Sequence, residues 1–141
     1  ICEAWVDTGI YGEASEWIPR VMIRRKGDAG LESTFVSVIE PYEGASKIAK
    51  IRKVPLDSGS GLALEITRAD GTTDVVLIND GKDPMEIAAR ALTANGEVIF
   101  THFDADKAVQ IHGANSASIK VGDIEQKDDD GNKSIQWKRS E

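Results

Sequence analysis

Short strand-like segments, separated by turn residues, recur along the whole chain. Leu62, Leu64 and Ile66 occupy every second position of one segment, and Asp70-Gly71 then offers a tight turn into the next. Turn signals return at roughly the 8 to 12 residue spacing that is typical of sandwiches and barrels. We therefore expect an all-β fold, an antiparallel two-sheet β-sandwich of roughly 9 to 11 strands with little helix.

Two of the other strand-like segments have distinctive patterns. Phe35, Val36, Val38 and Ile39 put apolar groups on both faces, which predicts a central strand covered on both sides. Residues 47–54 alternate poorly, which indicates an edge strand or a bulge. The remaining expected strands lie around Val21 and Ile23 and over residues 73–78, 98–103, 109–111, 117–121 and 135–137.

Residues 84–93 permit two interpretations. Asp83-Pro84 is a good helix start and Asn95-Gly96 a good helix stop. The same Asn95-Gly96 is also the best short hairpin turn in the chain, which favours a strand over residues 87–93. Because strands are expected on either side, we favour the strand, and a short helix stays open.

The length and the start of the chain bear on its organisation. A chain of 141 residues suits a single domain, here residues 1–141, with a core that needs no disulfide. It begins at Ile1 without a methionine or a signal peptide, so we expect a C-terminal domain excised from a longer protein. No apolar run approaches the length of about 20 residues that a membrane helix requires, so no membrane partner is expected.

Charge and cysteine content exclude several classes of site. The net charge of -7 is spread along the chain and argues against nucleic acid as a partner. Arg24, Arg25 and Lys26 form the densest basic cluster, which is either solvated or in contact with an anionic ligand such as an acidic sugar. Cys2 is the only cysteine, so an intrachain disulfide and a thiolate zinc cluster are both impossible.

The two histidines are the obvious candidates for shared chemistry. A turn at residues 105–106 would place His102 opposite about Val109 and His112 opposite about Ile99. That register puts the two rings several residues apart and on different faces. We expect no shared metal and no catalytic role for either histidine.

The acidic run at residues 128–132 resembles a calcium loop but fails its pattern. Lys133 stands where the turn glycine belongs, and Arg139 stands where the bidentate glutamate belongs. A solvated turn before a final strand is the better interpretation. No phosphate loop, nucleophile elbow or zinc helix occurs either, so we expect no catalytic residue, no metal and no cofactor.

Four aromatic residues, Trp5, Tyr11, Trp17 and Tyr42, lie in the first third of the chain. Their flat faces could stack on sugar rings, or they could cover a core with a polar tip at the surface. Both roles stay open.

Two runs carry a family resemblance. Residues 24–27 (RRKG) and 33–44 (STFVSVIEPYEG) resemble a segment of heparinase II/III-like proteins, and residues 4–11 and 17–19 are compatible with it. The match covers roughly the first 55 residues; beyond them only the strand pattern agrees. This family includes polysaccharide lyases that act on acidic glycans, with a helical toroid before a β-sandwich. The resemblance assigns this chain to the C-terminal part of the sandwich.

The resemblance implies a parent enzyme that cleaves uronate-containing glycans by β-elimination, using a neutralised carboxylate, a Tyr or His base and a Tyr acid. Those groups come mainly from the toroid and earlier strands, so no position here inherits a catalytic role. The implied partners are the toroid domain and acidic polysaccharide, and the implied location is secreted or periplasmic in a bacterium. Possible carbohydrate or interface contacts are Trp5, Tyr11, Trp17, Arg24, Arg25 and Tyr42.

An independent carbohydrate-binding or adhesion module is the alternative. Such a module should carry a planar aromatic platform with polar neighbours. A domain that completes a larger enzyme should instead expose an apolar patch of several hundred Å².

Overall fold

A computed structural model describes residues 2–7, 15–20, 23–79, 81, 83–129 and 133–140. Strands dominate it, with a single 3-10 turn, so the all-β prediction is confirmed. Contacts divide the chain into two compact units, Ile1–Ile39 and Glu40–Glu141, and each is described by itself. The expectation of one domain over residues 1–141 stays a prediction.

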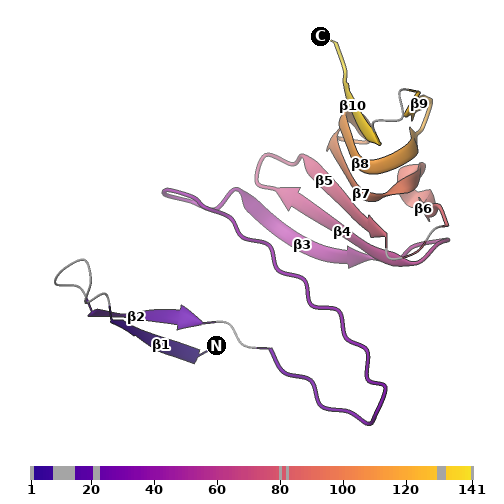
Figure 1. Ribbon diagram of the computed structural model, residues 1–141. Helices are drawn as coiled ribbons and strands as arrows, with labels where there is room; N and C mark the ends of the chain where they lie inside the picture. Colours follow the sequence, from indigo (N-terminus) through magenta and orange to yellow (C-terminus); the bar gives the residue numbers. More distant parts are fainter. Residues whose placement is uncertain are drawn as a thin grey trace. The chain divides into compact units, whose positions relative to one another are not determined.

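The first unit contains one hairpin. Strands β1 (Cys2–Asp7) and β2 (Ser15–Arg20) pair antiparallel, with Trp5 directly opposite Trp17 (Figure 1). Val21 lies outside the described residues, whereas residues 23–39 are described and contain no strand. The strands expected at Ile23 and over residues 35–39 are therefore wrong for this structure, because no neighbouring strand in the described chain offers that segment a ladder of hydrogen bonds.

The second unit is one antiparallel sheet, in the order β10-β8-β7-β5-β4-β3, with β6 beside β7 and β9 beside β8. The hairpin at Asp70-Gly71, the edge position of β3 with its bulge after Ile48, and the final strand are all confirmed. The strands are β3 (Ile48–Val54), β4 (Gly61–Arg68), β5 (Thr73–Asn79), β6 (Met85–Ile87), β7 (Leu92–Asp104), β8 (Lys107–Val121), β9 (Ile124–Lys127) and β10 (Ser134–Lys138).

The long β7–β8 hairpin bends this sheet around a single core, where the sequence favoured two separate sheets (Figure 1). Nearer the turn of this hairpin, residues 98–103 pair with β5 and residues 110–114 pair with β10. At its other end, residues 92–94 pair with β6 and residues 118–121 pair with β9. The register shifts at Asn95/Gly96, between the two parts, and such irregularities increase bending and twist. The segment after β3 contacts β6: the Asp57 amide donates a hydrogen bond to the Glu86 carbonyl at 2.8 Å.

Residues 84–93 combine strand and turn. β6 and the start of β7 are joined by one 3-10 turn, Ala88–Arg90, and by Ala91 in the left-handed conformation with φ 46°. Asn95-Gly96 lies inside β7 and forms neither a hairpin turn nor a helix stop. A Cβ at Gly96 would collide with Ser116 on β8, so glycine is needed here for close approach of the two strands.

The core lies on the inner face of the bent sheet. Alternate residues of each strand point inward, and in β4 these are Ala63, Glu65 and Thr67. Trp137 packs against the core from the edge. The buried apolar residues are Val54, Ala63, Val75, Leu77, Met85, Ile87, Leu92, Ala94, Ile99, Phe103, Ala108, Ile111, Ile119, Val121 and Ile135.

The turn at Gly71 gives a first testable prediction. Gly71 has φ +88°, and a Cβ there would meet no atom, so strain in the backbone is the only cost of a side chain. Gly71→Ala should lower the free energy of unfolding by about 1 kcal/mol, measured by urea denaturation. Gly71→Asn should cost less, because asparagine tolerates this conformation better than alanine. Equal stability of alanine and wild type would contradict this account.

Candidate functional site

The outer face of the sheet, opposite the core, is ordered in rows that run across the strands. Register places directly paired residues side by side, at the Cβ spacing of about 5 Å that is usual for such pairs. One row is polar along its whole length, whereas the other two are apolar on β5 and become polar toward β10. From β5 to β10 the rows are Asp74–His102–Gln110–Lys138, Val76–Phe100–His112–Gln136 and Ile78–Val98–Ala114–Ser134.

Both histidines lie on this face, contrary to the sequence prediction. The turn at residues 105–106 is present, but His102 faces Gln110 and His112 faces Phe100. A register shift between His102 and Phe103 displaces the pairing by one residue, which reverses the face that a side chain occupies. The two rings therefore stand in adjacent rows, and Gln110 of the first row hydrogen-bonds to His112 of the second.

A buried carboxylate fixes the first histidine. Asp74, nearly inaccessible to solvent, accepts hydrogen bonds from Arg68 Nε at 2.8 Å and from His102 Nδ1 at 2.6 Å. Because the carboxylate accepts the hydrogen bond from Nδ1–H, the ring is oriented and its Nε2 is left for another partner. Arg68 and His102 both reach Asp74 from the same face of the sheet.

Two hollows follow one another along β8 on this face. The first, of about 390 Å³, is lined by His102, Asp104, Val109, Gln110, Lys138, Arg139 and Ser140. The second, of about 240 Å³, is lined by residues 98, 100, 112–114 and 134–136. Small side chains at residues 113, 114 and 134 leave this space open. Both hollows are shallow and polar on one side.

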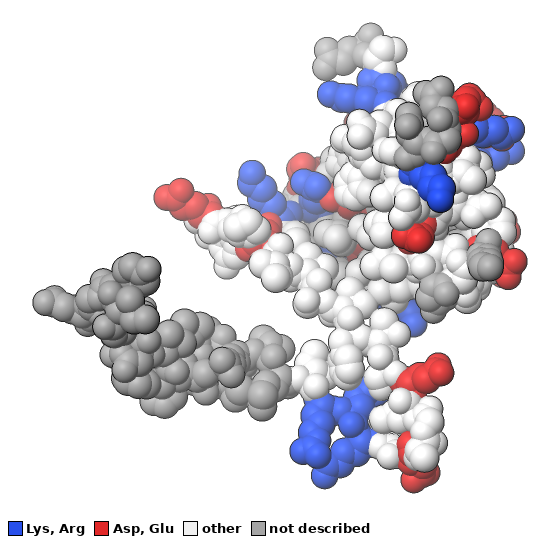
Figure 2. Space-filling model, in the orientation of Figure 1, with Lys and Arg blue, Asp and Glu red and all other residues white. Residues whose placement is uncertain are grey.

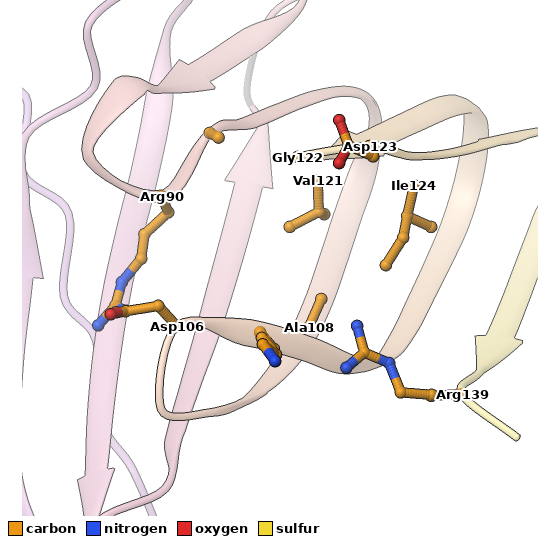
Figure 3. Close-up of a pocket in the computed structure, with 10 residues that line it drawn as sticks. Arg90, Asp106, Ala108, Val121, Gly122, Asp123, Ile124 and Arg139 are labelled. Atoms are coloured by element: carbon orange, nitrogen blue, oxygen red, sulfur yellow. The ribbon is translucent and has the colours of Figure 1, made fainter. Parts of the chain in front are cut away.

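A third hollow, also of about 390 Å³, opens where the turns of the bent hairpin meet (Figure 3). Its apolar wall is Ala108, Val121 and Ile124, and charged side chains surround it in the close-up view. Arg90 is paired with Asp106 at 3.4 Å, so part of that charge is already neutralised.

An ion network is buried on the inner face. Glu65 is 6% exposed, and its two oxygens accept from Arg52 Nε at 2.7 Å and from Arg90 Nη2 at 2.6 Å. The Arg90 guanidinium also lies over the Phe103 ring, 5.2 Å from its centroid. Sequence reasoning missed this network, because its members lie on β3, on β4 and beside β7.

Stability should depend on the ionisation of Glu65. Burial raises the pKa of its carboxyl, but hydrogen bonds and charge attraction from Arg52 and Arg90 outweigh burial and hold the pKa below 4.5. The network therefore stabilises the fold fully above pH 4.5, and this contribution is lost as pH falls through the folded-state pKa. Thermal unfolding followed from pH 7 to pH 3 should show that loss. Glu65→Gln should remove the part of this pH dependence that Glu65 causes. A mutant curve parallel to wild type throughout would contradict this.

Of the six residues expected to make contacts, five belong to the first unit and Tyr42 belongs to the second. Trp5 and Trp17 are register partners on β1 and β2, and Tyr11 lies outside the described residues. Arg24 and Arg25 are exposed in the irregular segment that follows, where basic side chains gather in Figure 2. Tyr42, in the second unit, is exposed, and the hollows described above are lined by other residues.

Only part of the acidic run is described. Asp128 Oδ2 accepts from the Lys133 amide at 2.9 Å, while residues 130–132 lie outside the described residues. Across the described ranges no group of three His, Cys, Asp or Glu side chains is placed to hold a metal ion. Nor does any helix in this part of the chain have the length and apolar character to cross a membrane.

Compared with protein-family models, curated proteins and solved structures, the chain matches none.

Proposed function

We propose that this chain is a noncatalytic β domain, the C-terminal sandwich region of a heparinase II/III-like protein that acts on acidic polysaccharides. The observation that supports this most is the apolar half of the outer face. Ile78 and Val98, paired neighbours on β5 and β7, are 41% and 43% exposed, and Ile51 on β3 is similarly open. Between them lie Leu62, Ile66 and Val76, which are partly buried, and Leu64, which is only 9% exposed.

A contiguous apolar face of this kind suits a second layer of protein. Large exposed apolar patches on soluble proteins mark interaction sites. The aromatic platform expected of an independent sugar-binding module is not found on the described outer face, because Phe100 and His112 are tilted by 49° to each other. The surface thus favours a domain that completes a larger enzyme.

The segment at residues 33–39 gives independent support. Phe35, Val36, Val38 and Ile39 are all exposed, Ile39 to 86%, in a stretch that pairs with no strand of the described chain. Apolar side chains on both faces suit a strand buried within a sheet. The same residues carry the family resemblance. In this proposal, the rest of the parent protein supplies the strand that pairs with them.

The chemistry of the described residues agrees with a noncatalytic role. β-Elimination requires a base, an acid and a group that neutralises the carboxylate. Of the described residues that could act as base or acid, His102 is hydrogen-bonded to Asp74. No described hydrogen bond connects His102 with Tyr42. In this proposal the catalytic groups belong to a toroid domain and to earlier strands of the parent protein, which is secreted or periplasmic in a bacterium.

Amide hydrogen exchange tests the proposal. In the chain alone, residues 33–39 should exchange rapidly, because their backbone amides have no described partner. In the full-length protein the same amides should become protected, while protection in β4, β5 and β7 stays high in both. Unchanged rapid exchange of residues 33–39 in the full-length protein would contradict the proposal.

A further inference from the structure

The last strand, β10, forms one edge of the sheet. It pairs with β8 on one side, and no strand of the described chain pairs with its other side. We infer that this free edge binds β10 of a second copy of the chain, antiparallel and about a twofold axis at Gln136. The two sheets then continue into one another. This contact is independent of the proposed function, because it leaves the apolar half of the outer face uncovered.

The backbone of β10 directs unused hydrogen-bonding groups to the free edge. The Arg139 amide donates to the Val109 carbonyl at 3.0 Å, in the register that joins β10 to β8. In an antiparallel pair, such hydrogen-bonded positions alternate with positions whose N–H and C=O point the other way. Every second residue of β10 therefore presents its backbone groups to the free edge. These residues are Ser134, Gln136 and Lys138.

Two such edges complement each other in one register. A twofold axis at Gln136 sets this residue against itself and Ser134 against Lys138 of the second copy, so all the outward backbone groups of β10 find partners. No two like charges then stand opposite each other. On the inner face, Ile135 stands opposite Trp137 of the second copy. Trp137 is only partly buried at the edge of the core, and this pairing gives it an apolar neighbour.

The other edge of the sheet is protected against the same kind of pairing. Its strand β3 has a bulge after Ile48 and carries Lys50, Arg52 and Lys53. Antiparallel pairing of two β3 strands about Ile51 would set Lys50 against Arg52 of the second copy, which is unfavourable. Bulges and cations of this kind keep sheet edges from pairing. β10 has an unbroken register with β8, and its single cation meets a serine in the twofold pair.

The size of the contact sets its expected strength. One pair of five-residue strands is a small interface, below the roughly 1,200 Å² that stable complexes bury. We therefore expect a weak dimer in exchange with monomer. Sedimentation velocity of the intact chain should show the dimer fraction rising between about 10 μM and about 1 mM.

Charge at Gln136, which is exposed, tests the register. Gln136→Glu and Gln136→Lys each set two like charges against each other at the twofold axis, so each should weaken dimerisation about fivefold. A one-to-one mixture of these two variants should recover dimers at least as strong as those of wild type, because opposite charges then face each other. The matched controls Thr93→Glu and Thr93→Lys place the same charges at an exposed position of β7 and should leave association unchanged.

Three results would overturn the inference: a chain that stays monomeric up to about 1 mM, dimers that are insensitive to the charge at Gln136, or Glu and Lys variants whose mixture does not recover. Dimerisation through the apolar half of the outer face would give the second of these results. None of them affects the proposed function, which the hydrogen exchange of residues 33–39 tests separately.

Discussion

Phe103→Ala should lower the free energy of unfolding by about 4 kcal/mol. The Phe103 ring is 1% exposed on the inner face of β7, where its removal would leave a cavity that the surrounding strands cannot fill. The substitution also removes the ring beneath the Arg90 guanidinium, so a charge that now has an aromatic neighbour would lose it. Urea denaturation followed by circular dichroism measures the change.

Phe100→Ala is the matched control. Phe100 lies three residues earlier on the same strand but on the outer face, and it is only half-buried. Its truncation should cost about 1 kcal/mol, since less apolar surface is involved. A cost for Phe100→Ala equal to that for Phe103→Ala would show that the two faces have been assigned wrongly.

Glu65→Gln should lower the free energy of unfolding by about 3 kcal/mol at pH 7, the lower end of the cost of breaking a buried ion pair. The lower end applies because the Arg52 side chain is 51% exposed, so water screens its interaction with Glu65. A cost remains because Arg90 is only 19% exposed and would be left partly buried beside a neutral amide. Equilibrium denaturation at pH 7 is the measurement.

Glu125→Gln provides the comparison for Glu65→Gln. Glu125 pairs with Lys127 at 2.9 Å, but both side chains are exposed on β9. Its loss should change the free energy of unfolding little, because water screens an exposed pair. If the two glutamines destabilise the protein equally, then burial of the Glu65 network is not what gives it its strength.

Local sequence patterns predicted the elements whose structure depends on neighbours in the chain. The Asp70-Gly71 hairpin forms because its turn chemistry and its flanking strands agree. The poor alternation of residues 47–54 correctly indicated an edge strand with a bulge. The final strand begins directly after the acidic turn, as its composition predicts.

Features of the fold that depend on residues distant in the sequence could not be predicted from local patterns. One sheet replaces two because β7 and β8 continue through the irregularity at Asn95-Gly96, which locally resembles a hairpin turn. Whether that dipeptide reverses the chain depends on Ser116, twenty residues away. The shift near His102 likewise moved both histidines onto one face, and no local pattern signals it.

The sequence also did not predict which face of β4 points toward the core. Alternation in β4 alone favours placing Leu62, Leu64 and Ile66 toward the core, yet Ala63 and Glu65 face inward. The more apolar set lies on the outer face, beside Ile78 and Val98. An outer face that is apolar in this way is physically reasonable if another protein layer covers it, which is the basis of the proposed function.

Release of unsaturated uronate from a panel of acidic polysaccharides should be measured for the chain and for its full-length protein. We expect product from the full-length protein on at least one uronate-containing polymer and none from the chain alone, at equal molar concentration and with the chain folded by circular dichroism. Product from the isolated chain, or none from the full-length protein on any member of the panel, would contradict it.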